Sequence, residues 1–254
     1  AYMLVVNAAN IQKDWDYISI HNTANVEMQN ISDRTALLAV QGPKASRILQ
    51  RLTDISLIDM PYYTFAKGTF AGVANTLISA TGYTGSGGFE IYFDNTDAET
   101  IWNAILDAGS SYNLRPVGLA ARNTLRLEKG YMLYGNDIND TTTPLEAGLG
   151  WITKLNKPNF IAKEALLKQK KNGIALTLIG FELTDKGVAR DHCPITDFEG
   201  NRIGEVTSAC PSPSLKKSIG IGYVPTAYAQ PNTPIFIQVR DKLLAAQVVP
   251  TPFL

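Results

Sequence analysis

Apolar and polar positions follow two different patterns on either side of Gly173. Before it, apolar residues recur every three or four positions in several segments, which is the spacing of an amphipathic helix. Shorter runs that are rich in β-branched and aromatic residues lie between these segments and predict strands. Helices are predicted near residues 10–20, 43–52, 96–106 and 116–130, with a further helix ending at 168–171. Strands are predicted at residues 2–6, 36–40, 62–65, 70–79 and 89–93, the first of them buried.

Three of the predicted helices begin at recognisable start signals. Asn10 can cap the first helix, because asparagine oxygens accept hydrogen bonds from free backbone N–H groups there. Pro43 suits the first turn of the second helix. Thr96 and Glu99 have the spacing of a capping box ahead of the third. These signals support helices that alternate with strands in this part of the chain.

The chain after Gly173 has no helical periodicity. Short β-rich runs, separated by Gly, Pro, Asn and Asp, are typical of a small barrel or sandwich. The runs cover residues 175–183, 202–208, 218–223, 235–239 and 243–249. We therefore predict an α+β protein with two regions, an α+β region at residues 1–172 and a β-rich domain at residues 173–254.

Composition and charge narrow the classes of function. The 254 residues carry 23 Lys+Arg and 23 Asp+Glu, whereas nucleic-acid binding normally leaves a domain basic. No apolar run approaches the roughly 20 residues that span a bilayer, so we expect no membrane partner. Two cysteines cannot form a disulfide framework, which favours a reducing compartment such as the cytoplasm. The first residues have no charged region and too short an apolar stretch for a signal peptide, and they lie inside a predicted strand, so we expect that an upstream segment is missing.

A glycine-rich stretch at residues 81–90 is the first candidate for chemistry. It resembles a phosphate loop, but it lacks the Lys-Ser/Thr ending and precedes a strand rather than a helix. The glycines instead allow a sharp turn that presents Tyr83 and Glu90. Glu90 lies between two apolar residues, where a carboxylate needs donors from the protein or a ligand. The alternative is a solvated glutamate that points outward.

Two further polar residues are candidates for ligand binding, each with a structural alternative. Arg122 and Arg126 lie one turn apart, at and beyond the edge of the apolar face of a predicted helix. Arg122 could hold a ligand carboxylate through its planar fork, or form an ordinary salt bridge. Asn7 follows the first predicted strand, where ligands commonly bind, but asparagine is equally common in turns.

The remaining His, Cys and acidic residues give weaker indications of a functional site. His21 and His192 lack the spacing of a metal site, so no metal is expected. Cys193 is expected to be inert, because a neighbour in sequence does not make His192 its base. Residues 136–140 are too short for a calcium loop and are predicted to be a polar turn. The residues alone thus predict a ligand site around Glu90, Tyr83 and Arg122.

Several longer segments resemble one family, the aminomethyltransferases, or T-proteins, of the glycine cleavage system. They extend over almost the whole chain. The segments are 4–10 (LVVNAAN), 40–43 (VQGP), 82–85 (GYTG), 88–90 (GFE), 115–128 (RPVGLAARNTLRLE), 144–149 (PLEAGL) and 213–217 (PSLKK).

The resemblance implies a fold of three domains around a central hole that holds tetrahydrofolate, with a C-terminal β-barrel. It implies that the methylene of an aminomethyl group on the dihydrolipoyl arm of H-protein passes to tetrahydrofolate, with release of ammonia. By motif match, Glu90 takes the role of the pterin-binding glutamate. Tyr83, Arg122, Tyr131 and Asn7 match other positions of the folate pocket. A bacterial protein of this family would be cytoplasmic, and a eukaryotic one would lie in the mitochondrial matrix.

The chain departs from the family pattern at two places. Ser86 and Gly87 stand where most members have an acidic pair. The family's catalytic aspartate belongs to a segment upstream of the first residue here, so we expect no catalytic residue within this chain. We therefore expect an incomplete T-protein that does not support normal turnover alone. A folate-dependent demethylase and a non-catalytic folate-binding protein of the same superfamily remain as alternatives.

Overall fold

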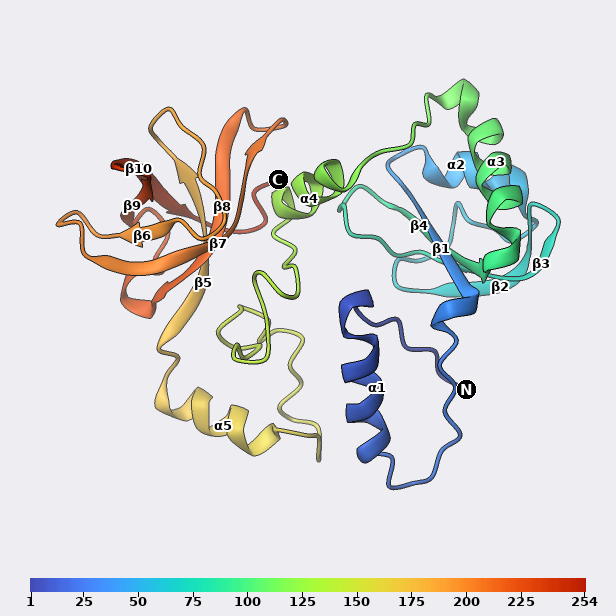
Figure 1. Cartoon of the computed structure of the whole chain (residues 1–254), viewed down its shortest axis with the longest axis horizontal. Helices are drawn as coiled ribbons and strands as arrows, with labels where there is room; N and C mark the ends of the chain where they lie inside the picture. The colour runs from blue at the N-terminus through green and yellow to red at the C-terminus, as the bar shows by residue number, and fades with distance from the viewer. The chain divides into compact units, whose positions relative to one another are not determined.

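The computed structural model describes all residues from 1 to 254, and its contacts divide the chain into two compact units. The units are Ala1–Val117 and Gly118–Leu254. Each is described by itself below (Figure 1). None of the α-helices reaches the length of a bilayer span: the longest, α3, has 12 residues, against about 20 that are needed.

The N-terminal unit is built around a four-stranded antiparallel sheet in the order β1-β4-β3-β2. Its strands are β1 (Thr35–Gln41), β2 (Phe65–Phe70), β3 (Val73–Ser79) and β4 (Gly88–Asp94). Its helices are α1 (Ile11–Ile20), α2 (Ala45–Leu49) and α3 (Ala98–Gly109), with short 3₁₀ turns η1 (Ala8–Asn10), η2 (Ser32–Arg34), η3 (Gln50–Leu52), η4 (Asn95–Asp97) and η5 (Ser110–Tyr112). Strands β1 and β4 and the helices α2 and α3 lie where the sequence predicts them.

Helices α2 and α3 cover one face of this sheet and form the core of the unit with it. On α3, Ile101, Ile105 and Ala108 are buried, which is the spacing of one helical face. The alternation of strand side chains sends Val40 of β1 and Ile91 of β4 into the same core. The residues that alternate with these core residues along the strands point to the opposite face of the sheet.

That second face, called here the open face, contains the register row of Glu90. Ala39 and Ser79 flank Glu90 on the neighbouring strands, and Phe65 follows beyond Ser79. Phe65 is 67% exposed and Ala39 is exposed as well. Glu90 thus stands between two small side chains, in a row whose outer members, Ala39 and Phe65, are exposed.

Two predicted strands of this unit are wrong. Residues 2–6 form no strand, and their side chains are exposed rather than buried, with Tyr2 fully exposed. Their composition favours extended backbone, but a strand also needs a neighbouring ladder, and no described strand pairs with them. Residues 62–64 form a turn instead, closed by the Thr64 amide on the Pro61 carbonyl at 3.2 Å. Tyr63 adopts a φ of 66° there, which no strand allows.

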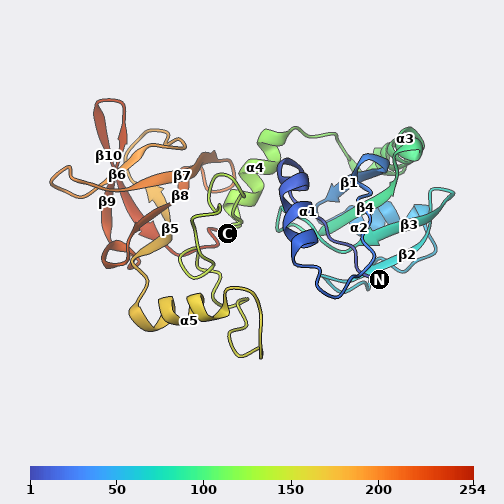
Figure 2. The same cartoon turned by 60° about the horizontal axis from the view of Figure 1, so that its bottom comes forward.

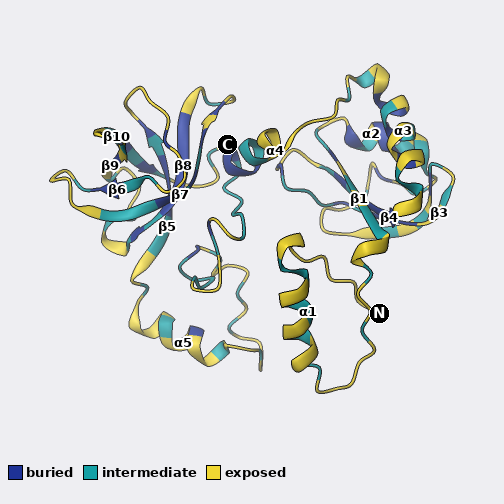
Figure 3. Cartoon of the chain, viewed as in Figure 1, coloured by how far each residue is buried: buried dark blue, intermediate teal, exposed yellow.

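The start signals of the helices also act differently from the prediction. Asn10 precedes α1 but makes no capping bond, and Asp97 precedes α3 likewise. The capping oxygens belong to Asn7, which accepts from the Ala9 amide, and to Asp94, which accepts from the Thr96 amide. A 3₁₀ turn precedes each helix, so the cap lies one turn earlier. Helix α1 buries none of its residues and is largely exposed (Figure 3).

The C-terminal unit contains a closed barrel with the strand order β10-β5-β8-β7-β6-β9 (Figures 1 and 2). Its strands are β5 (Leu176–Leu183), β6 (Pro194–Thr196), β7 (Arg202–Ser212), β8 (Lys217–Pro225), β9 (Pro234–Val239) and β10 (Lys242–Val249), with a 3₁₀ turn η6 (Thr226–Tyr228). The predicted β-barrel is confirmed, and only the three-residue β6 escaped the sequence pattern. Apolar residues from all six strands fill its interior.

Helices α4 (Leu119–Glu128) and α5 (Lys163–Asn172) precede the barrel, and α4 packs against β7 and β8. The C-terminal half of α4 is buried, whereas Leu119 at its start is exposed, so the predicted broad apolar face is buried only in part. In both views α5 lies outside the barrel (Figures 1 and 2). The contacts divide the chain at Val117, and the barrel begins at Leu176; the domain boundary near Gly173 stays a prediction.

Candidate folate site

The glycine-rich stretch forms the connection between β3 and β4, and Gln41 at the end of β1 holds it. Gln41 Nε2 donates to the carbonyl oxygens of Thr81 and Phe89, at 3.2 Å each. Gln41 Oε1 accepts from the Thr84 hydroxyl at 3.1 Å. One amide side chain therefore ties the beginning, the middle and the end of this loop together.

Glu90 follows the loop directly as the third residue of β4 and lies half-buried on the open face. Its Oε2 accepts hydrogen bonds from the hydroxyl groups of Thr81 and, at 3.3 Å, of Tyr92. A carboxylate offers about four lone-pair positions, so these two bonds leave acceptor capacity, above all on Oε1. The first of the two sequence alternatives is confirmed: Glu90 has hydrogen-bond donors from the protein and is not a fully solvated glutamate.

Tyr92 keeps its proton throughout the physiological range. Burial, followed by the charge of Glu90 and the hydrogen bond to it, raises the pKa of Tyr92 to about 12. Each cause disfavours a phenolate: burial removes water, and a neighbouring carboxylate repels a second negative charge. Tyr92 is therefore a permanent donor that orients the Glu90 carboxylate.

Asn7 and Tyr83 complete the predicted site residues of the N-terminal unit. Asn7 is exposed, and its Oδ1 accepts from the Ala9 amide at 3.0 Å, which is the turn-forming role. Tyr83 is half-buried within the glycine-rich loop. Within this unit, Tyr83 thus lies in the glycine-rich loop and Glu90 lies on the strand that follows it. Asn7 has a structural role, because it accepts a hydrogen bond in the turn before α1.

Arg122 and Tyr131 belong to the C-terminal unit. Arg122 is exposed on the first turns of α4, and Tyr131 lies half-buried just beyond the end of this helix. The Tyr131 amide donates to the Arg126 carbonyl at 2.8 Å. The five predicted residues therefore divide between the two units, three in the first and two in the second.

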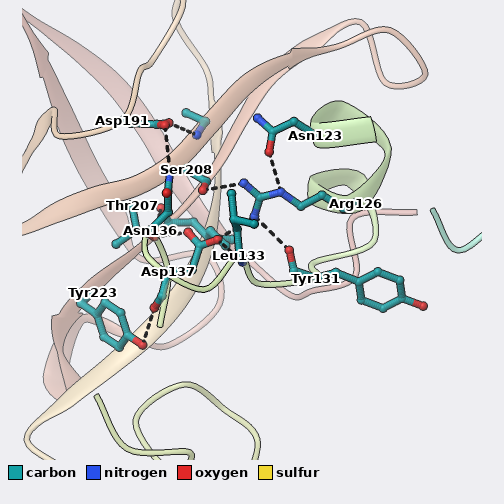
Figure 4. Close-up of polar contacts among 12 residues, drawn as sticks. Asn123, Arg126, Tyr131, Leu133, Asn136, Asp137, Asp191, Thr207, Ser208 and Tyr223 are labelled. Atoms are coloured by element: carbon teal, nitrogen blue, oxygen red, sulfur yellow. Dashed lines mark hydrogen bonds and ion pairs between the residues drawn. The ribbon is translucent and has the colours of Figure 1, made fainter. Parts of the chain in front are cut away.

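Sequence reasoning missed a buried ion pair between α4 and the turn at residues 136–140 (Figure 4). Arg126 Nη1 lies 2.6 Å from Asp137 Oδ2, and both side chains are almost fully buried. The predicted polar turn does form, but Asp137 is buried and accepts hydrogen bonds from residues outside the turn, among them the Leu133 amide. The available signal was the place of Arg126 between two leucines on the apolar part of α4.

A small cleft of about 200 Å³ lies beside the glycine-rich loop. Residues 86–88 of the loop line it together with Met60 and Tyr62, among others. Glu90 is not among the lining residues, so this cleft is separate from the carboxylate discussed above. No group of three or more His, Cys, Asp or Glu side chains is placed to bind a metal ion, and both cysteines are free.

Comparisons with known proteins identify the family. Residues 1–157 match the GCVT N-terminal domain, and residues 177–254 match the glycine cleavage T-protein C-terminal barrel domain. The chain belongs to the glycine cleavage T-protein family, a family of aminomethyltransferases. The resemblance drawn from the sequence motifs is thereby confirmed.

Individual T-proteins agree over nearly the whole chain. It is 57% identical over 252 residues to the aminomethyltransferase of Flavobacterium psychrophilum and 53% identical over 253 residues to that of Bacteroides fragilis. Each alignment covers 99% of this chain and 70% of the relative. The crystal structure of aminomethyltransferase T from Bartonella henselae superposes with a TM-score of 0.87 at 32% identity, over 98% of this chain and 67% of that one.

Proposed function

We propose that this T-protein transfers the methylene of an aminomethyl group from the dihydrolipoyl arm of H-protein to tetrahydrofolate, releasing ammonia. Membership of the aminomethyltransferase family supports the reaction class. Tetrahydrofolate and the lipoyl-bearing H-protein are the acceptor and the donor that this chemistry requires. No metal takes part in the proposal.

Glu90 is proposed to bind the pterin ring of tetrahydrofolate. One edge of a pterin presents two adjacent N–H donors, which a carboxylate can accept in parallel. Thr81 and Tyr92 fix the carboxylate through Oε2, so its orientation is set before the ligand arrives. The small side chains of Ala39 and Ser79 leave space beside it for a flat ring.

The other four residues are proposed to complete the folate pocket. Tyr83 and Tyr131 each offer an aromatic face for the pterin or the aminobenzoyl ring. Arg122 offers a planar fork for a carboxylate, and Asn7 offers an amide. No nucleophile among them would attack carbon, so their contribution is the positioning of the folate amine against the methylene carbon.

The orientation of Glu90 on the open face is the observation that carries this proposal. Replacing it by alanine in the full-length protein should weaken tetrahydrofolate binding by about 1–3 kcal/mol, because the pterin donors lose their partner. That is a roughly 5- to 150-fold increase in Kd. A fluorescence or calorimetric titration measures it, and Glu99→Ala, at an exposed position of α3, is the matched control.

Two results would contradict the proposal. One is unchanged folate affinity in a Glu90→Ala variant that folds normally. The other is production of methylenetetrahydrofolate from a small methylated amine without H-protein, which would indicate a demethylase instead. The full-length protein with aminomethylated H-protein and tetrahydrofolate is expected to form methylenetetrahydrofolate and ammonia in equal amounts.

A further inference from the structure

Arg126 is a buried guanidinium that uses all three of its nitrogens (Figure 4). Only 1% of the residue is exposed. Its Nε donates to Oδ1 of Asn123 at 2.7 Å, and its Nη2 donates to Oγ of Ser208 at 2.7 Å. Its Nη1 donates to Oδ2 of Asp137 at 2.6 Å and to the Tyr131 carbonyl oxygen at 2.9 Å. The fork thus joins α4, the segment after it, and β7.

Asp137 completes the same network from the opposite side. Besides Arg126, its Oδ2 accepts from the Leu133 amide at 2.7 Å, and its Oδ1 accepts from the Thr207 hydroxyl at 2.6 Å. The Tyr223 hydroxyl donates to the Asp137 carbonyl at 2.9 Å. Both carboxylate oxygens are therefore satisfied, and the segment from 131 to 137 is fastened to β7 and β8 (Figure 4).

Tyr131 is held by Arg126 twice. The Arg126 side chain donates to its carbonyl oxygen, and the Arg126 carbonyl accepts from its amide at 2.8 Å. Arg122 lies one helical turn before Arg126 on α4, so the same anchor fixes the helix that presents it. Neither Arg126 nor Asp137 has a side chain that reaches solvent, so neither can bind a ligand itself.

We propose that the Arg126–Asp137 pair is the positioning device of the folate site, fixing the backbone that presents Arg122 and Tyr131. The proposal rests on the proposed function, which places those two residues in the folate pocket. A buried ion pair is a weak source of stability, because desolvation offsets its attraction. The planar guanidinium donates its hydrogen bonds in fixed directions, which apolar packing would not do. Its four bonded partners are therefore held at defined positions relative to one another.

Arg126→Lys in the full-length protein separates positioning from folding. Lysine keeps the positive charge opposite Asp137, but its single ammonium cannot reach Asn123, Ser208 and the Tyr131 carbonyl together. We expect a folded variant whose KM for tetrahydrofolate rises and whose kcat/KM falls roughly 10- to 100-fold, as small misplacements of binding groups do. A purely structural role would lower the amount of active enzyme and leave KM unchanged.

Glu128→Gln is the matched control. Glu128 lies on the same helix, is 2% exposed, and accepts hydrogen bonds from Ser212 and Ser214, which lie outside the segment that Arg126 fastens. The Glu128→Gln variant should be less stable than the wild type and keep its KM for tetrahydrofolate. An unchanged KM in a folded Arg126→Lys variant overturns the proposal. So does an equal rise in KM in the two variants, which would indicate general loosening of α4.

A second measurement distinguishes this proposal from the function on which it rests. If Glu90→Ala and Arg122→Ala leave folate binding unchanged, the proposed function fails. Backbone amide exchange without any folate then decides the present proposal. Loss of protection at Tyr131 and Leu133 in Arg126→Lys, with protection kept in Glu128→Gln, supports the anchoring of this segment. Unchanged protection refutes it.

Discussion

A β-carbon added to Gly82 would lie 1.8 Å from Oε1 of Gln41. The amide of Gln41 occupies the place that any side chain at position 82 would need. The same amide bonds to Thr81, Thr84 and Phe89, so it cannot turn away without releasing the glycine-rich loop. The loop is glycine-rich at this point because a side chain from another strand fills the space beside it.

Gly82→Ala is therefore expected to displace Gln41 and loosen the loop that precedes Glu90. The cost in unfolding free energy should be about 1–3 kcal/mol, the range for overpacking at a well-filled position. Folate affinity should fall as well, since Tyr83 and Glu90 lie on the loop and the strand after it. Chemical denaturation and a folate titration of the full-length variant measure the two effects.

The cause can be checked by a double variant and a neutral glycine. Gln41→Ala should remove the obstruction, so Gly82→Ala should cost less in that background than in the wild type. Gly150→Ala is the control, because its β-carbon would meet only Leu145 at the ordinary contact distance of 3.6 Å. Additive effects of the Gly82 and Gln41 substitutions would show that the two residues do not compete for space.

A larger side chain opposite Glu90 should block the proposed pterin site without unfolding the protein. Ala39 is exposed and faces Glu90 across β1 and β4. Ala39→Leu fills the space beside the carboxylate, and we expect folate affinity to fall about tenfold or more, an effect of at least ~1.4 kcal/mol. Stability should change by no more than about 0.5 kcal/mol, as for other surface positions.

Ala74→Leu, at an exposed position of β3, is the matched control and should leave both quantities unchanged. Folate titrations and thermal unfolding of the two variants give the comparison. Equal folate affinity of Ala39→Leu and the wild type would place the pterin elsewhere than beside Glu90.

The sequence predicted best where local pattern and final environment coincide. The barrel strands and α3 alternate or repeat in ways that match the sides they bury, so their positions follow from periodicity. The half-buried position of Glu90 on β4 could be predicted for a similar reason, because a carboxylate between two apolar strand residues needs hydrogen-bond donors. The short β6 has only three residues and offers no period to detect.

The remaining features depend on contacts between residues distant in the chain. Nothing near Asp137 indicates that a guanidinium eleven residues earlier and Thr207 of β7 will surround it. Tyr62 and Tyr63 have strand-forming side chains, yet a turn set by Pro61 and the Ala80 carbonyl places them outside the sheet. Propensity is a weak guide at such positions, since tertiary contacts decide them.

Asp137→Asn should destabilise the C-terminal unit strongly. It removes the charge opposite Arg126, which has no solvent access, and breaking a buried pair on one side costs about 3–5 kcal/mol. Glu205→Gln removes a charge opposite Arg202 in an exposed pair, whose side chains are 41% and 60% exposed, and should cost about 0–1 kcal/mol. Urea unfolding of both variants tests the contrast. Similar small losses of unfolding free energy in both would contradict the prediction and indicate that water solvates the Arg126 guanidinium in Asp137→Asn.

Alkaline pH should destabilise the protein through two tyrosines. Burial, as the largest cause, raises the pKa of both Tyr92 and Tyr223 to about 12, from an ordinary value near 10. A group whose pKa is raised on folding contributes its full stability below its pKa in the unfolded state. That contribution is lost as the pH rises through its pKa in the folded state.

The free energy of unfolding should therefore fall between about pH 10 and pH 12. Its decrease with pH should be shallower in Tyr92→Phe and in Tyr223→Phe. Denaturation curves at several pH values, with tyrosinate absorbance recorded in parallel, test this, and equal slopes in both variants and the wild type would contradict it.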